Sequence, residues 1–279
     1  GTTTIDENAF YNSSNLQHIN IANTVNRIEL RGFSYARGLQ EITIPSSLTT
    51  IGSGAFSSNQ ISGELIIPNS VITIGNNAFS DNQISSLTLP NDLTSIEGYA
   101  FSNNQINSLT IPNSVTTIKR DAFSSNQISS LTLPNDLTII EDYAFSSNQI
   151  SDVMLPNSLN SLSGFNNNQL TEITIPSSVT AIGVSAFENN QISNLTILSS
   201  VKTIGEHAFS SNAFDELIIE KCADDVCDNS VFSYATVKKL MINSGNIKDD
   251  AFRNSYNSSS NFKIQNLILN DGVTSIGNT

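Results

Sequence analysis

Basic residues are scarce in this chain: 12 Lys and Arg stand against 25 Asp and Glu among 279 residues, which gives a net charge of −13. No Lys or Arg occurs from Gly38 to Ile118, and none from Asp121 to Val201. Nucleic-acid binding needs cations that neutralise phosphates, so the composition excludes nucleic acid as a partner and disfavours an anionic membrane surface. No apolar run approaches the roughly 18 residues of a transmembrane helix, so we expect no membrane insertion of this segment.

Residues that carry catalytic chemistry are also few. The chain has no Trp and only two His, His18 and His207, which lie in no recognisable triad context. The Gly-containing turn at 52–57 lacks the Lys of a phosphate-binding loop, and no acidic calcium-loop motif occurs. We therefore expect no enzyme activity, no cofactor and no metal site.

The two cysteines, Cys222 and Cys227, lie five residues apart in one irregular repeat. A disulfide between them is possible if the protein is exported, because such bonds persist in oxidising compartments. Free or buried thiols fit the sequence equally well. Metal binding is the weakest alternative, because the pair has no matching second pair.

What the chain does contain is a repeat of fixed phase. All seven prolines belong to it, with successive spacings of 23, 22, 22, 22, 22 and 20 residues. Twelve of the fourteen phenylalanines form a second column in the same phase: Phe10, Phe33, Phe56, Phe79, Phe101, Phe123, Phe145, Phe165, Phe187, Phe209, Phe232 and Phe252. A period of 20–30 residues indicates a β-rich solenoid, and we count about twelve coils of 20–23 residues.

The repeat beginning at Leu109 shows what each position does. The segment 109–111 alternates apolar and polar residues and stops at Pro112, which indicates a short half-buried strand. The next segment, 115–118, spaces its apolar residues three apart and fits either a second short strand or a helical turn. The side chains expected to point inward are Leu109, Ile111, Val115, Ile118, Ala122, Phe123 and Ile128.

An asparagine follows the phenylalanine by three residues in eight coils: Asn59, Asn82, Asn104, Asn126, Asn148, Asn168, Asn190 and Asn212. We interpret this column as structural, because a buried amide can satisfy the backbone groups that a tight turn leaves unpaired. Each Asn should be buried and bonded to the backbone of its own or the next coil.

The pattern resembles the BspA-like class of leucine-rich repeats, whose unit reads L-x-x-I-x-I-P-x-x-V-x-x-I-G-x-x-A-F. The match is LQEITIPSSLTTIGSGAF at 39–56 and LTEITIPSSVTAIGVSAF at 170–187. The resemblance implies a right-handed curved ribbon in which the strand before the proline lines the concave face. It also implies an extracellular or cell-surface location and a protein or peptide partner, such as a host surface or matrix protein. Family members often carry Cys where this chain carries the Asn column.

Candidate binding residues lie on the outward columns of that strand. In the middle of the chain the column two residues before the proline is mostly Thr, whereas near the C-terminal end it becomes Ile218, Met241 and Ile268. Three apolar side chains in adjacent coils on a solvent face predict a contact patch, unless further coils or the insertion at 253–263 cover them. The candidate set is Met154, Glu172, Glu216, Ile218, Lys239, Met241 and Ile268.

Two functions fit this sequence. The first is a non-enzymatic protein-binding module of a surface adhesin or host-interaction protein, favoured by the varied C-terminal columns. The second is a structural spacer that presents another domain at the cell surface, favoured by the uniform Thr and Ser columns. We expect residues 1–279 to form a single solenoid, and a fragment of a longer surface protein, because both ends cut through a repeat.

Overall fold

The computed structural model describes residues 1–222, 227, 230–247 and 263–276. The chain is a β-solenoid of about eleven turns, one fewer than the repeat count predicts, and no helix occurs among the described residues. It divides into two compact units. Unit 1 comprises Gly1–Leu137 and Ala144–Gln149, and unit 2 comprises Thr138–Tyr143 and Ile150–Thr279.

The segment after each proline is a strand, which settles the alternative that its spacing left open. In unit 1 these strands are β1 (Thr4–Ile5), β2 (Arg27–Ile28), β3 (Thr50–Ile51), β5 (Thr73–Ile74), β7 (Ser95–Ile96) and β9 (Thr117–Ile118). In unit 2 they are β11 (Ile139–Ile140), β12 (Ser161–Leu162), β13 (Ala181–Ile182) and β15 (Thr203–Ile204). In unit 1 β1, β2, β3 and β5 pair in parallel, as at Ile28, Ile51 and Ile74, and β7 pairs with β9, but β5 and β7 belong to different sheets; in unit 2 β11, β12, β13 and β15 pair in that order.

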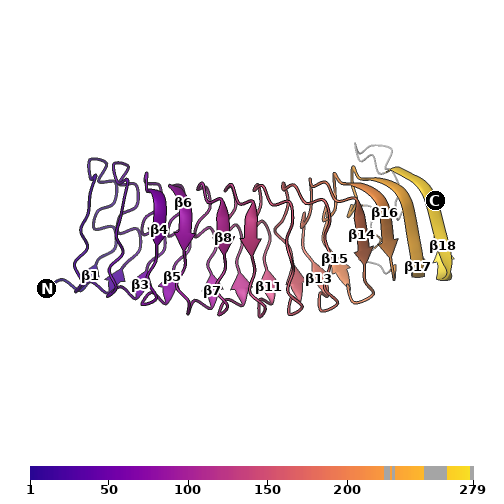
Figure 1. The fold of residues 1–279 in the computed structure, drawn as a ribbon, viewed down its shortest axis with the longest axis horizontal. Helices are drawn as coiled ribbons and strands as arrows, with labels where there is room; N and C mark the ends of the chain where they lie inside the picture. The colour runs from indigo at the N-terminus through magenta and orange to yellow at the C-terminus, as the bar shows by residue number, and fades with distance from the viewer. Residues whose placement is uncertain (223–226, 228–229, 248–262, 277–279) are drawn as a thin grey trace. The chain divides into compact units, whose positions relative to one another are not determined.

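The segment before each proline forms a second parallel ladder. Figure 1 shows β4, β6 and β8 on the opposite edge of the coils from β3, β5 and β7. In unit 1 the pre-proline ladder contains β4 (Ser62–Ile66), β6 (Gln83–Thr88), β8 (Ser108–Thr110) and β10 (Ser130–Thr132), paired as β4–β6 and β8–β10. In unit 2 it contains β14 (Asn194–Ile197), β16 (Ala213–Ile219), β17 (Thr236–Ile247) and β18 (Lys263–Ile276), in that order.

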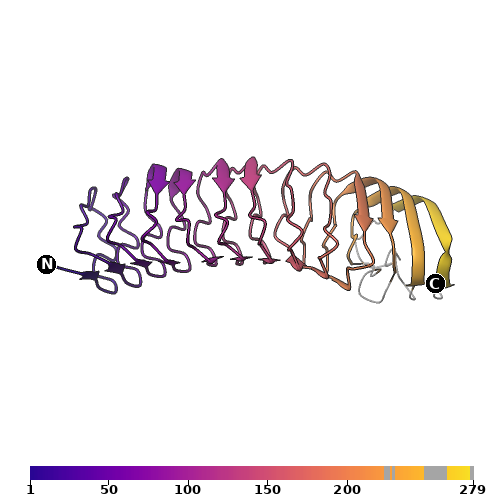
Figure 2. The same cartoon turned by 60° about the horizontal axis from the view of Figure 1, so that its bottom comes forward.

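The pre-proline ladder is not one continuous sheet. Residues 152–155 form no strand, and the coil that holds them is two residues shorter than its neighbours. Where prolines are present, strands stop early, because Pro112 and Pro134 have no N–H to continue a ladder. Asn243 takes the proline position in β17, and that strand continues for 12 residues (Figure 2).

The phenylalanine column is the core of each coil. Phe56, Phe79, Phe101, Phe123, Phe145, Phe165, Phe187 and Phe209 are all fully buried, which confirms the predicted burial. Within each unit their rings stack in parallel, and the centroid of Phe123 lies 5.5 Å from that of Phe101 and 5.6 Å from that of Phe145. The other inward positions of that coil, from Leu109 to Ile128, are buried as predicted. Phe252 lies outside the described residues.

The asparagine column is buried and bonded to the backbone. The Nδ2 of Asn126 donates to the carbonyl of Phe123 in its own coil at 3.2 Å and to that of Phe101 at 2.9 Å. Its Oδ1 accepts from the N–H of Ile106 at 3.0 Å. The structural role is confirmed, with one correction: the neighbouring coil that the amide bridges is the preceding one.

Two residues with left-handed backbone flank most phenylalanines of the column. The first stands two positions before the ring, as Arg31, Gly54, Asn77 and Tyr99 do, with φ between 54° and 61°. The second stands two positions after it, as Tyr35, Ser58, Asp81 and Asn103 do, with φ between 54° and 59°. We call the surface that carries these two columns the Phe-turn face. Its turns fix the backbone, and their side chains are free to vary.

Candidate functional site

The predicted contact row lies in register on the pre-proline ladder of unit 2. Ile218 on β16 pairs with Met241 on β17, which pairs with Ile268 on β18. Thr196 on β14 occupies the same column one coil earlier. The structure therefore brings the three apolar residues together on adjacent strands, and the apolar row begins at Ile218.

A charged row runs beside the apolar one. Glu216 pairs in register with Lys239, and their side chains form an ion pair at 2.7 Å. A second ion pair joins Lys238 and Asp215 at 2.6 Å. Both pairs are partly exposed, so each contributes little to stability. They fix two ammonium groups beside the apolar row.

Two predicted residues do not join this cluster. Met154 is the most exposed of the set, with 88% of its surface open, but Thr174 and Thr196 occupy its column between it and Ile218. Glu172 is exposed and bridges to Asn194, which separates it from Glu216. The sequence analysis grouped Met154 and Glu172 with the other residues only because they occupy the same columns of the repeat.

The apolar row is also less open than a solvent-facing column predicts. Ile218 and Met241 are half-buried, because each packs between outward neighbours on the adjacent strands, while Ile268 is 37% exposed. The insertion proposed to cover the row, residues 253–263, lies outside the described residues except for Lys263, the first residue of β18. The apolar row is therefore only partly exposed to solvent, and its most exposed residue is Ile268 on β18.

The sulfur atoms of Cys222 and Cys227 are bonded to each other in the structure, and their Cα atoms are 5.5 Å apart. Both residues are buried, and Cys222 bridges to Gly245 of β17. The bond lies in the coil that carries the apolar row, so it ties down the chain next to β16 and β17.

Neither histidine is part of a catalytic arrangement. The Nδ1 of His18 is 3.4 Å from a carboxylate oxygen of Glu41, with both side chains exposed, and the Nδ1 of His207 lies 3.2 Å from the hydroxyl of Ser210. Among the described residues no three His, Cys, Asp or Glu gather as metal ligands. The same residues include no helix that is long and apolar enough to cross a membrane.

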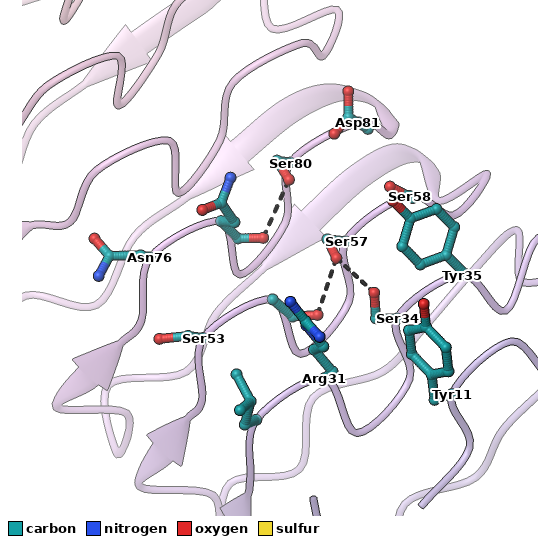
Figure 3. Close-up of a pocket in the computed structure, with 13 residues that line it drawn as sticks. Tyr11, Arg31, Ser34, Tyr35, Ser53, Ser57, Ser58, Asn76, Ser80 and Asp81 are labelled. Carbon is teal, nitrogen blue, oxygen red and sulfur yellow. Dashed lines mark hydrogen bonds between the residues drawn. The ribbon is translucent and has the colours of Figure 1, made fainter. Parts of the chain in front are cut away.

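A groove that the sequence analysis did not predict lies on the Phe-turn face of unit 1 (Figure 3). Its volume is about 480 Å³. Tyr11 and Tyr35 stand at one end with ring centroids 5.7 Å apart, Arg31 lies between the turns, and Asp81 stands at the other end. The floor consists of the buried serines Ser34, Ser57 and Ser80.

The groove exists because Gly54 has no side chain. The equivalent position holds Tyr in two other coils, at Tyr99 and Tyr143. Gly54 leaves that space open between Arg31 and Asn77, its neighbours in the column. A glycine among large residues in a variable column is the signal that could have located this groove from the sequence.

Arg31 differs from Arg27 and Arg120, whose guanidinium groups are both hydrogen-bonded. The guanidinium of Arg27 is bonded to Glu29 at 2.8 Å, which raises the pKa of Arg27 above its usual value. A hydrogen bond to Tyr99 likewise raises the pKa of Arg120. Within the described part of the chain, the Arg31 side chain makes neither an ion pair nor a hydrogen bond. The groove therefore contains an arginine that forms no ion pair, together with the carboxylate of Asp81 at its other end.

Solved structures support the fold. A leucine-rich repeat protein from Bacteroides ovatus is 23% identical with a TM-score of 0.61, covering 99% of this chain and 60% of that chain. YopM from Yersinia enterocolitica is 19% identical with a TM-score of 0.54, covering 90% and 56%. The pneumococcal vaccine antigen PcpA is 21% identical with a TM-score of 0.52, covering 89% and 71%. The chain thus spans less than two thirds of the first two proteins.

The family comparison is more specific. No curated protein matches the chain. The model of the BspA type leucine-rich repeat region matches residues 3–81, 62–164 and 162–279, in six copies. These matches cover nearly every coil, together with the proline, phenylalanine and strand columns described above. The chain therefore belongs to the BspA-type leucine-rich repeat family.

Proposed function

We propose that this chain is a non-enzymatic protein-binding module of a cell-surface or secreted protein that acts in adhesion or host interaction. The observation that carries the proposal is the apolar row Ile218–Met241–Ile268, in register on β16, β17 and β18. Six earlier coils place Thr on this outward column, at residues 43, 88, 110, 132, 174 and 196. Large apolar side chains at such a position are the type of residue in which interface energy concentrates.

The partner is a protein or peptide with a basic face. An open ladder of strands offers a long flat surface, whereas most small-molecule sites are enclosed clefts. The net charge of −13 attracts a basic partner over long range. Glu216 and Lys239, paired at 2.7 Å, orient the partner beside the apolar row, and Met154 and Glu172 extend the contact along unit 2.

An extracellular or surface location fits the disulfide between Cys222 and Cys227, because such bonds form and persist outside the reducing cytosol. It also fits what the family resemblance implies. We further propose that residues 1–279 act as one solenoid within a longer surface protein.

The test is a pull-down against host surface and matrix proteins, followed by affinity measurement with Ile218→Asp/Met241→Asp. This variant places two carboxylates in the apolar row, so it should weaken binding at least about tenfold. The matched control is Thr88→Asp/Thr110→Asp, which changes two exposed residues of the same column in unit 1. Binding that survives the first pair of changes moves the site elsewhere.

The second candidate is a structural spacer. Thr43, Thr88, Thr110 and Thr132 are exposed on this column in unit 1, with Ile66 between the first two, and the small threonines favour a surface without a partner. The spacer is the correct function if the full-length ectodomain captures no protein in the same pull-down.

A further inference from the structure

We propose that the groove on the Phe-turn face of unit 1 is a carbohydrate site, and that it takes an oligosaccharide whose terminal sugar carries a carboxylate. This site is separate from the apolar row of unit 2 and would supply a second kind of recognition. The inference rests on three properties of the groove: its aromatic end, its unbonded polar side chains, and its unpaired arginine.

The aromatic end is suited to a sugar ring. Tyr11 and Tyr35 are 46% and 37% exposed, unlike the buried phenylalanines beside them. Their rings meet at 71°, so they form a corner with two aromatic surfaces, and the guanidinium of Arg37 lies 5.5 Å from the centre of the Tyr35 ring. A pyranose packs its C–H face against such a ring, while tyrosine hydroxyls stay available for hydrogen bonds.

The walls are suited to hydroxyl groups. The side chains of Ser53, Ser58, Asn76 and Asn77 line the groove, and none of them makes a hydrogen bond within the described part of the chain. Hydroxyls and amides both donate and accept, which matches the mixed donors and acceptors of a sugar. The floor serines are already occupied: Ser34 bonds to Ser57 at 2.8 Å, and Ser80 donates to the carbonyl of Asn77 at 3.3 Å.

The charge pattern selects an acid with a single negative group. Arg31 offers a planar fork of donors that matches a carboxylate in two-point geometry. Asp81, which accepts from the amide of Asn103 at 2.6 Å, stands at the far end and repels further negative charge. The net charge of −13 also opposes a polyanion. A sugar with one carboxylate, such as a terminal sialic or uronic acid, satisfies Arg31 without approaching Asp81.

The groove can be filled by a substitution that the fold already accommodates. Gly54 has φ of 61°, and Tyr occurs at the same turn position with φ of 58° at Tyr99 and 61° at Tyr143. A Cβ at residue 54 would lie 3.4 Å from the nearest atoms of Arg31 and Ser57, an ordinary contact. Gly54→Tyr should therefore fold and close the groove.

The experiment is saturation-transfer NMR on the intact chain with 3′-sialyllactose, a glucuronic-acid-terminated disaccharide and lactose as probes. We expect saturation of at least one acidic glycan, with its carboxylated sugar receiving the most, and little of lactose. Gly54→Tyr should abolish this signal. Arg31→Gln, which removes the charge and the fork of guanidinium donors, should raise the Kd at least about tenfold, the value of a charge-assisted hydrogen bond.

The control is Ser125→Tyr, which adds a tyrosine to the Phe-turn face at a position where Tyr35 shows that the turn accepts it. Its binding should equal that of the unmodified chain. The proposal is overturned if no acidic glycan is saturated, if Gly54→Tyr leaves binding unchanged in a folded protein, or if Arg31→Gln binds as well as the original. Saturation of an acidic peptide such as acetyl-Glu-Ser-Glu, with none of any glycan, also overturns it.

Discussion

The substitution Asn126→Ala tests the role of the asparagine column most directly. Asn126 is buried and makes its hydrogen bonds to backbone groups of two coils. When the amide is removed, the carbonyl of Phe101 keeps a second donor, the Nδ2 of Asn104 at 3.2 Å. The N–H of Ile106 has no other acceptor in the described part of the chain. The change therefore orphans one buried donor.

The expected loss of stability follows from the unpaired N–H of Ile106. A buried N–H without a partner destabilises the fold by about 1–3 kcal/mol, whereas the net loss of a single satisfied hydrogen bond is about 0.5–1.5 kcal/mol. The stability lost in Asn126→Ala should therefore fall in the larger of these two ranges, about 1–3 kcal/mol. Its local effect should be a loss of hydrogen-exchange protection at Ile106, because that amide becomes free to open.

Asn59→Ala is the matched control, since Asn59 is equally buried but satisfies no N–H. Its Oδ1 has no partner, and its Nδ2 donates to carbonyls of Phe33 and Phe56 at 3.0 and 2.9 Å. The Phe56 carbonyl keeps the amide of Asn82 at 2.9 Å, and the Phe33 carbonyl keeps the N–H of Ala36 at 3.4 Å. No group is orphaned, so the cost should be about 0.5–1.5 kcal/mol.

The assay is native-state hydrogen exchange followed by mass spectrometry or NMR, combined with urea unfolding. Exchange is preferred because a repeat array can unfold in parts, which makes one global free energy ill defined. Equal losses for Asn59→Ala and Asn126→Ala, or full protection of Ile106 in Asn126→Ala, would refute the bridging role of the amide.

Three further outcomes follow from the same structure. Phe123→Ala should lower stability by about 3–5 kcal/mol, since it removes a buried ring stacked between two others; an unchanged melting temperature would contradict the core assignment. Association with a basic partner should weaken when NaCl rises from about 0.05 to about 0.5 M, and salt-independent affinity would argue against steering by net charge. The purified, unreduced protein should show no free thiol toward a thiol-reactive dye, because Cys222 and Cys227 are bonded; a stoichiometric reaction would contradict this.

Burial could be predicted from the sequence because it is enforced in every coil. A phenylalanine or asparagine that recurs at one position must meet the same neighbours each time, so the column identifies both the core and its hydrogen bonds. The strand after the proline was harder, because apolar residues three apart suit a helical turn as well as a two-residue strand such as Thr117–Ile118. Only pairing with the next coil distinguishes them.

The direction of the asparagine bridge could not be predicted either. The amide reaches the preceding coil, and nothing in a column of identical residues indicates which neighbouring coil it contacts. The Oδ1 of Asn59 is unsatisfied for a separate reason. The coil before it has one extra residue between its phenylalanine and Leu39, so the N–H of Leu39 bonds to Ala36 at 2.8 Å instead.

The candidate contact row shows where comparing one repeat position from coil to coil predicts a surface patch correctly and where it does not. Reading the outward position coil by coil located Ile218, Met241 and Ile268 on adjacent strands. The same reading also selected Met154, although two threonines separate it from Ile218. Adjacency in a solenoid depends on consecutive coils, so a column predicts a patch only where the unusual residues follow one another without a gap.

The groove of unit 1 illustrates the opposite case, in which function depends on departures from the repeat. Gly54 leaves a hollow only because its column neighbours have side chains, and the hollow is bounded by Tyr35 and Arg31, which belong to the preceding coil. Each departure alone is an ordinary variation at an exposed turn. Their combination in adjacent coils places rings, amides and one unpaired cation around a single space. In a repeat protein the residues that recur in every coil explain why the chain folds, and a candidate recognition surface lies where neighbouring coils differ.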